Sequence, residues 1–139
     1  MATPGCSGKP LKAKLGIKPG MAVAVVAPPR AYETILGEPL DPPAAVCVKP
    51  SGVRKGACDL VHLFCPDYAA LAKGGARALE GLREGGALWV SWPKKSSKLF
   101  ADLTEDGVRE VLLPTGWVDV KVCAVDADWS GLKFLRRRG

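Results

Sequence analysis

The chain has 139 residues and a formal net charge of +6, with 47% hydrophobic and 24% charged residues. These values are ordinary for one globular domain. A chain of this length buries roughly 65–70% of its unfolded surface, so it needs no disulfide or metal for stability. No apolar run approaches the roughly 18 residues of a membrane span, and residues 1–14 lack the apolar core of a signal peptide. We therefore expect a soluble, cytoplasmic protein without membrane contacts.

The first half of the chain predicts short elements separated by Pro- and Gly-rich turns. Residues 1–8 are small and contain glycine, so we expect them to be disordered, followed by a single domain over 9–139. The run MAVAVVA is continuously apolar and of strand length, which suits a strand covered on both faces. In chain order we expect a helix at 9–15, a strand at 21–27, a helix at 31–36, and strands at 44–48 and 59–65.

The middle of the chain predicts a longer helix and a fourth strand. Asp67 is placed to cap a helix over 68–84, in which apolar residues repeat at helical spacing. Three glycines weaken that helix by roughly 1 kcal/mol each relative to alanine, or permit close packing on the sheet. Residues 87–92 then form the fourth strand.

The last third predicts a capped helix and a closing hairpin. Asp102 and Glu105 have the spacing of a capping box, so we expect a helix from Leu103 to about Leu113 with Asp102 as its cap. The strand expected at 117–125 alternates between apolar and charged residues. Its predicted apolar face consists of Val118, Val120, Val122 and Ala124. A turn at 126–131 leads to a partner strand at 132–136.

This order of elements predicts an α/β fold. Helices placed between strands imply mostly parallel pairing with right-handed crossovers, and the terminal hairpin makes the last strand antiparallel. We expect helices on both faces of the sheet.

Several segments resemble a trimmed methyltransferase-type, Rossmann-like domain. They are KPGMAVAVVAPP, DLVHLFC, EGLREGGALWVSWPKK and the closing hairpin. More closely, the chain resembles the small bacterial family called domain of unknown function 3052. The pieces that carry this resemblance are SGKPLKAKLGIKPGM, DLVHLF, GGALWVSWPKKSS, DLTEDGVREV and VDVKVCAVDADWSGLKFLRR. The resemblance implies the fold and no established activity, and the segment 37–43 and the region of Cys58 match less clearly.

The cofactor signature of such folds is missing. A dinucleotide or S-adenosylmethionine site usually has a Gly-rich turn after the first strand, where free amides approach the ligand. Here that turn is Ala27-Pro28-Pro29-Arg30, and proline has no N–H. An acidic residue that would hold ribose hydroxyls after the second strand is replaced by Lys49. We therefore predict no cofactor of this kind.

The cysteines and the single histidine predict no metal site. Zinc prefers clustered Cys and His ligands, whereas these residues are dispersed, odd in number and without CxxC spacing. We interpret them as buried or incidental thiols and His62 as a hydrogen-bonded core residue. The cysteines are Cys6, Cys47, Cys58, Cys65 and Cys123.

Ligands of α/β sheets bind beyond the carboxyl ends of the strands, and charged and aromatic residues follow those ends here. Cationic side chains there suit a phosphate or carboxylate. Each residue also has a plainer interpretation: solvated lysines, tryptophans that close a core edge, and turn-forming Asp and Ser. The candidate ligand-binding residues are Lys94, Lys95, Trp92, Lys49, Arg30, Asp128, Trp129 and Ser130. Trp117 is a further candidate for an aromatic wall.

Three function hypotheses follow, with no catalytic residues assigned. The first is a non-catalytic module that binds a small anionic ligand or a partner protein at this edge. The second is a divergent, methyltransferase-like transferase acting on an anionic substrate, with Lys94 or Lys95 stabilising developing charge. The third is nucleic-acid binding driven by the basic chain ends, which is less favoured because basic and aromatic residues do not interleave. On balance the sequence favours a non-enzyme.

Overall fold

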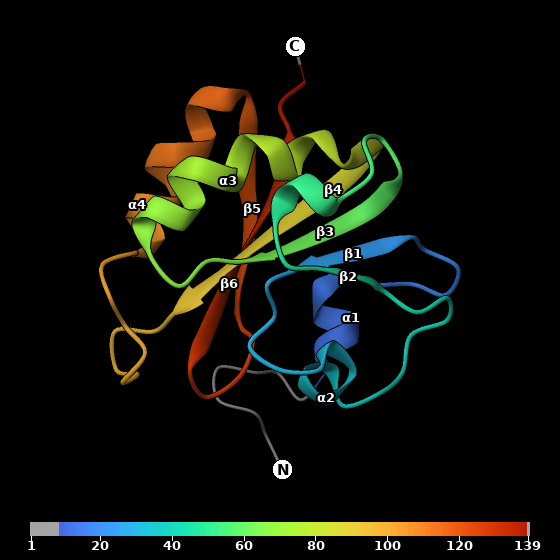
Figure 1. The fold of residues 1–139 in the computed structure, drawn as a ribbon, viewed down its shortest axis with the longest axis horizontal. Coiled ribbons are helices and arrows are strands. Elements are labelled where there is room, and N and C mark those ends of the chain that lie inside the picture. The colour runs from blue at the N-terminus through green and yellow to red at the C-terminus, as the bar shows by residue number, and fades with distance from the viewer. Residues whose placement is uncertain (1–8, 139) are drawn as a thin grey trace.

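Six strands form one mixed sheet in the computed structural model, which describes residues 9–138 (Figure 1). The strands are β1 (Val23–Val26), β2 (Ala45–Cys47), β3 (Cys58–Phe64), β4 (Leu82–Pro93), β5 (Trp117–Ala124) and β6 (Trp129–Arg136). Their order in the sheet is β2-β1-β3-β4-β6-β5. The first four strands are parallel, and β6 runs antiparallel to both β4 and β5. This confirms the predicted α/β class and the antiparallel C-terminal hairpin.

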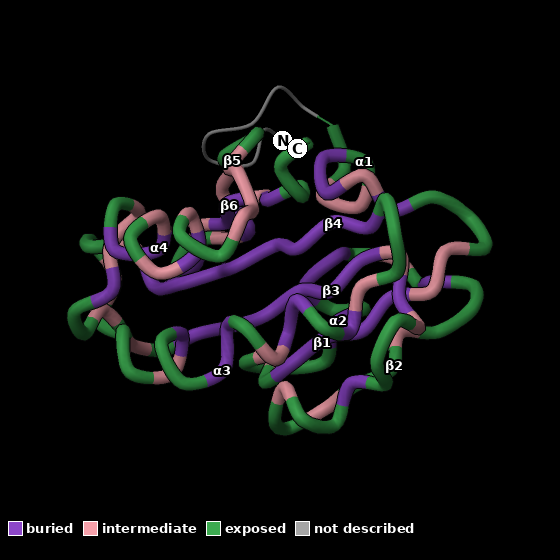
Figure 2. Tube along the Cα trace, turned by 90° about the horizontal axis from the view of Figure 1, so that it is seen from above, coloured by how far each residue is buried: buried purple, intermediate pink, exposed green. Residues whose placement is uncertain are grey.

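Helices cover both faces of the sheet, as predicted. One apolar cluster joins α3 (Tyr68–Glu80) and α4 (Glu105–Leu112) to one face, and a second joins α1 (Leu11–Leu15) and α2 (Tyr32–Leu36) to the other. Short 3-10 turns, η1 (Pro50–Gly52) and η2 (Leu113–Thr115), complete the elements. The expectation for residues 1–8 lies outside the described residues. Figure 2 shows the buried chain concentrated in the central strands β1, β3 and β4.

Strand β3 shows why the sequences of the central strands are continuously apolar. Val61 and Leu63 belong to the cluster under α3 and α4, whereas Leu60 and Phe64 belong to the cluster under α1 and α2. Because alternate side chains enter opposite cores, a strand covered on both faces has no polar side to display.

His62 is a buried core residue of β3, as the sequence predicted. Its Nδ1 lies 2.7 Å from the Tyr32 hydroxyl and its Nε2 lies 2.6 Å from Ser91 Oγ. The imidazole also stacks on Phe64, with ring centroids 4.3 Å apart. All four side chains are buried, so the sheet contains a satisfied polar chain between α2 and β4.

The predicted helix at 68–84 is too long at its C-terminal end, because α3 stops at Glu80 and β4 starts at Leu82. Carbonyls at the helix end accept hydrogen bonds from the segment that leads into β3 and from its first residue: Glu80 from the Gly56 amide and Gly81 from the Cys58 amide. These contacts from a distant part of the chain end the helix earlier than the residues alone indicate.

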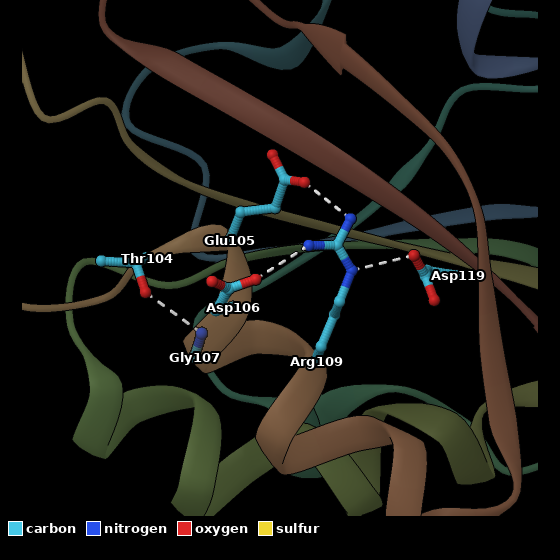
Figure 3. Close-up of polar contacts among 6 residues, drawn as sticks. All are labelled: Thr104, Glu105, Asp106, Gly107, Arg109 and Asp119. Carbon is cyan, nitrogen blue, oxygen red and sulfur yellow. Dashed lines mark hydrogen bonds and ion pairs between the residues drawn. The ribbon is translucent and has the colours of Figure 1, made fainter.

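Asp102 does not cap the helix that follows it, so that part of the prediction is wrong. Helix α4 begins at Glu105, and Thr104 Oγ1 accepts the hydrogen bond from the Gly107 amide (Figure 3). The carboxylate of Asp102 instead accepts from the Tyr68 amide at the start of α3. Asp67 caps that helix as predicted, accepting from the Ala70 amide. Thr104 caps α4 because its side-chain oxygen also accepts hydrogen bonds and it directly precedes the first helical residue.

Helix α4 is fixed to β5 through Arg109. The guanidinium donates to Glu105 and Asp106 on its own helix and, at 2.9 Å, to Asp119 on β5 (Figure 3). Hydrogen bonding from Arg109 lowers the pKa of the Asp119 carboxyl. The junction therefore positions the edge of the sheet against the helix layer.

The closing hairpin differs from its prediction in two respects. Strand β6 starts at Trp129 rather than 132, because the turn is already closed by then: the Asp126 carboxylate accepts from the Asp128 and Trp129 amides. The pairing of β5 with β6 also shifts between Asp119 and Lys121. This bulge breaks the predicted apolar face, and Val120 and Val122 are 50% and 52% exposed.

Candidate functional site

The candidate site lies where the sheet changes direction. Strand β1 pairs with both β2 and β3, so the chain moves outward to β2 and then crosses back to β3. In open α/β sheets such a switch point, at the carboxyl ends of the strands, is where ligands bind. The loops after β1 and β4 and the β5–β6 turn meet at this edge, as their mutual contacts below show.

The turn after β1 is built without the features that hold a nucleotide-type cofactor. Ala27 adopts a left-handed backbone with φ of 54°, and its amide donates to the Cys47 carbonyl 2.8 Å away. Pro28 and Pro29 follow, and neither has an N–H to offer. Exposed Lys49 stands after β2, where a carboxylate would bind ribose hydroxyls. These residues do not fit S-adenosylmethionine or a dinucleotide in the usual manner.

Arg30 is paired, and therefore does not present a free positive charge. Its Nη2 lies 2.7 Å from Asp126 Oδ2 in the β5–β6 turn, so the pair bridges the loop after β1 and the hairpin. Burial alone would raise the pKa of the Asp126 carboxyl. The hydrogen bonds from Arg30 and from the Asp128 and Trp129 amides outweigh burial and lower it. The pair is a clamp across the switch point.

The loop after β4 has the strongest features of an anion site. We call Lys94–Lys98, with the sequence KKSSK, the lysine loop. The Lys94 amide donates to the Asp128 carbonyl at 2.8 Å, and Ser97 Oγ donates to Asp128 Oδ1 at 2.9 Å. A turn closes from the Ser97 amide to the Lys94 carbonyl. The hairpin turn therefore holds the loop in a fixed shape.

The lysine loop leaves donors unused. Within residues 9–138, the amides of Lys95, Ser96 and Lys98 make no hydrogen bond. Lys94, Lys95 and Lys98 form no ion pair with any carboxylate of the described chain. Free amides on a tight turn beside ammonium groups favour a phosphate or carboxylate.

Lys49 lies too far from the lysine loop to share a small ligand with it. Strands β2 and β4 are separated by β1 and β3, so their ends are about 14 Å apart at the usual spacing between strands. The structure thus brings together Lys94, Lys95 and Asp128, and separately Arg30 and Asp126. The carboxylate of Asp128 accepts from Ser97 and forms no ion pair with these lysines.

The tryptophans of the candidate set are core residues. Trp92 is 5% exposed in the cluster under α3 and α4, whereas Trp129 is 6% exposed in the cluster on the opposite face. Both tryptophans therefore close the edge of a core, and they do not form an open aromatic wall for a ligand. Ser130 is half-buried and pairs with Trp92 in the β4–β6 ladder. Trp117 starts β5, at the other end of the sheet.

Sequence reasoning did not single out Ser97 or Lys98, although both belong to the lysine loop. The signal was the repeated KKSSK composition directly after a buried strand. Asp126 was interpreted as a turn former, which it is. Its second role as the partner of Arg30 had no local signal, because 96 positions separate the two residues.

The described residues show neither a membrane-spanning helix nor a metal centre. No helix between residues 9 and 138 is long and apolar enough to cross a bilayer. Over the same range, no three His, Cys, Asp or Glu side chains are grouped so as to hold a metal ion.

Comparisons by sequence found no relatives. No protein-family model matches the chain. No curated protein matches it either. The resemblance to the bacterial family of unknown function therefore stays a prediction.

Comparisons by structure show a methyltransferase-like fold. A ribosomal protein L11 methylase from Lactobacillus delbrueckii subsp. bulgaricus superposes with a TM-score of 0.63 at 15% identity, covering 92% of this chain and 76% of the methylase. A SAM-dependent methyltransferase from Aquifex aeolicus gives 0.61 at 13% identity, covering 88% and 85%. A possible exported protein from Bordetella parapertussis gives 0.61 at 15% identity; 93% of this chain matches, and it spans 66% of that protein. At these identities the similarity establishes the fold alone.

Proposed function

We propose that this protein is a binding module on a methyltransferase-like fold, which holds a small phosphate- or carboxylate-bearing ligand at the lysine loop. One observation carries the proposal: the loop is fixed by Asp128, yet it presents three unused amides and three lysines without a carboxylate partner in the described chain. A rigid turn loses little entropy on binding, and charge-assisted hydrogen bonds are the strong ones.

The turn after β1 supports a binding role over methyl transfer. Pro28 and Pro29 remove the amide donors, and the Arg30–Asp126 clamp lies beside them. We therefore assign no catalytic step to this edge. A partner protein that presents an acidic side chain or a phosphorylated residue would bind the same loop by the same contacts.

The test compares two double variants. Lys94→Ala with Lys95→Ala removes two charges from the loop. Lys9→Ala with Lys73→Ala removes two exposed lysines elsewhere and serves as the control. Inorganic pyrophosphate and citrate are titrated by calorimetry at low salt, and thermal midpoints without ligand check that each variant is folded.

We expect the loop variant to bind at least about tenfold more weakly than the control, because lost charge-assisted hydrogen bonds cost about 1.5–3 kcal/mol each. Equal affinity in both variants would rule out the lysine loop as the site.

The second candidate function is a divergent methyltransferase. The similar structures from Aquifex aeolicus and Lactobacillus are named as methyltransferases, which favours this function. The two prolines in the turn after β1 oppose it, because they offer no amide donors to a cofactor. Titration of S-adenosylmethionine decides between them. Saturable binding tighter than about 0.1 mM would support the enzyme, and it would contradict the argument from the two prolines.

Membership in the bacterial family of unknown function and a cytoplasmic location complete the proposal, and the less favoured alternative is nucleic-acid binding through the basic chain ends. This alternative predicts binding that weakens steeply as salt is added.

A further inference from the structure

A groove with a volume of about 850 Å³ lies at the opposite edge of the sheet. We call it the arginine groove. It lies at the start of β4, between the C-terminal end of α3, the beginning of β5 and the segment that leaves β6. Figure 1 shows the C-terminal segment emerging on the side of the sheet that carries α3. A volume of this size is typical of small-molecule sites.

One wall of the arginine groove carries uncompensated positive charge. Arg136, Arg137 and Arg138 all line it and are exposed, and none pairs with a carboxylate among residues 9–138. The backbone of the first two is held in place: Arg136 pairs with Trp117 in the hairpin ladder, and the Arg137 amide donates to the Gly116 carbonyl at 2.8 Å. Neighbouring guanidinium groups bind phosphate oxygens bidentately.

The remaining arginine of the groove is engaged in the fold. Arg83 donates to the Ala57 carbonyl at 2.6 Å and lies 3.4 Å from Asp59. Its charge is therefore compensated, and the anion-binding capacity belongs to the C-terminal arginines.

Part of the lining is apolar. Leu79, Leu82, Leu135 and the half-buried indole of Trp117 contribute to it, and Leu135 is 37% exposed. A half-buried indole beside leucines offers a surface on which a flat ring stacks. The ligand that suits the groove thus has a planar, partly apolar group as well as negative charge.

Two glutamates also line the arginine groove, and they narrow the class of ligand. Glu80 lies within ion-pair distance of Lys55 and Arg77, whereas exposed Glu84 has no such partner in the described chain. A carboxylate accepts hydrogen bonds from hydroxyl and amino groups but repels a second anion. An acidic peptide or a nucleic-acid strand would carry negative charge past these glutamates as well as past the arginines, so the lining favours a small ligand with charge at one end only.

We propose that the arginine groove binds a nucleoside phosphate. The phosphates lie against Arg136 and Arg138, the base stacks on Trp117, and the ribose or amino groups face Glu84. The site is separate from the lysine loop, because the two lie at opposite ends of β4.

The experiment uses ADP as the probe, in full-length protein that carries Lys94→Ala and Lys95→Ala, so that the lysine loop does not contribute. Calorimetric titrations compare ADP with pyrophosphate and adenosine. Three variants are added to this background. Arg136→Gln with Arg138→Gln removes the charge, Trp117→Leu removes the indole, and Arg54→Gln with Lys73→Gln is a charge-matched control outside the groove.

We expect ADP to bind more tightly than either pyrophosphate or adenosine. The arginine variant should weaken ADP at least about tenfold relative to the control. Trp117→Leu should weaken ADP several-fold and leave pyrophosphate unchanged, a pattern that general unfolding would not produce.

Three results would overturn the proposal. ADP fails to bind at about 1 mM; the control weakens ADP as much as the arginine variant, which indicates diffuse surface charge; or a single-stranded oligonucleotide binds while ADP does not. If ADP binds the intact chain but not the background lacking Lys94 and Lys95, the ligand belongs to the lysine loop instead.

Discussion

His62 is neutral in the folded protein because of where its neighbours place it. The imidazole is fully buried between Tyr32, Ser91 and Phe64, and burial lowers its pKa to about 3. Both ring nitrogens have hydroxyl partners, so the neutral ring is satisfied without a proton from solvent. In the unfolded chain the same residue takes up a proton near its ordinary pKa of 6.5.

Stability should therefore fall as the pH drops from about 6.5 toward 3, where the unfolded state binds a proton that the folded state does not. The expected loss is about 1.4 kcal/mol per pH unit. His62→Gln should flatten the dependence of the thermal midpoint on pH between about 7 and 5, above the range where most carboxylates titrate. Tyr32→Phe is the control, since it keeps the titrating ring. A wild-type profile as flat as that of His62→Gln would contradict a buried neutral imidazole.

The candidate site shows the same dependence on surroundings. Arg30 and Lys94 both follow strand ends, yet Arg30 is neutralised by Asp126 while the side chain of Lys94 forms no ion pair in the described chain. By residue type alone, Arg30 and Lys94 are equally good candidates for binding an anion. Their partners, more than 30 positions away along the chain, decide which one is available to a ligand.

At the scale of elements, the glycines in α3 and directly after it decide how closely the neighbouring segment packs. A Cβ on Gly74 would lie 2.7 Å from Pro50 Cγ, and one on Gly81 would overlap Val53 Cγ1. The sequence left open whether these glycines weaken the helix or permit close packing. They permit it, although the partner is the segment around η1 and not the sheet.

Replacing Gly81 with alanine should therefore destabilise the protein by about 1–3 kcal/mol, the usual cost of overpacking a filled site. Val53→Ala removes the atom that a new Cβ would strike. In a double-mutant cycle measured by urea unfolding, the two changes together should cost less than the sum of the single changes. Strict additivity would show that the cost comes from somewhere other than this contact.

The ends of the helices and strands depend on contacts that the sequence pattern does not show. The sequence located α3, α4, β5 and β6 correctly as elements, but their ends moved by up to four residues. The causes differ in range. Contacts from Gly56 and Cys58, distant along the chain, end α3 early, whereas the Asp126 carboxylate acts locally and closes the turn before β6.

At the scale of the whole molecule, the two proposed sites lie at opposite ends of β4, which runs from Leu82 in the arginine groove to Pro93 before the lysine loop. Twelve strand residues span roughly 36–40 Å between them. Ligands bound so far apart in a rigid sheet share no partners.

Citrate and ADP should therefore stabilise the protein additively. Each bound ligand contributes RT ln(1 + [L]/Kd), so the stabilisation measured with both should equal the sum of the separate contributions. Urea unfolding of the wild-type protein with neither, one or both ligands gives the three differences. A combined effect no larger than the greater single one would mean that the two compete for one site.

Local pattern was enough to predict the α/β class, the parallel core, the terminal hairpin and the missing glycine turn, because apolar periodicity, strand length and proline chemistry are properties of neighbouring residues. The tertiary structure alone decided the Arg30–Asp126 clamp, the clip that Asp128 forms on the lysine loop, the burial of Trp92 and Trp129 on opposite faces, and the arginine groove. Each of these joins segments that are distant along the chain. Which distant side chains meet is fixed by the strand order of the sheet, and no local pattern encodes that order.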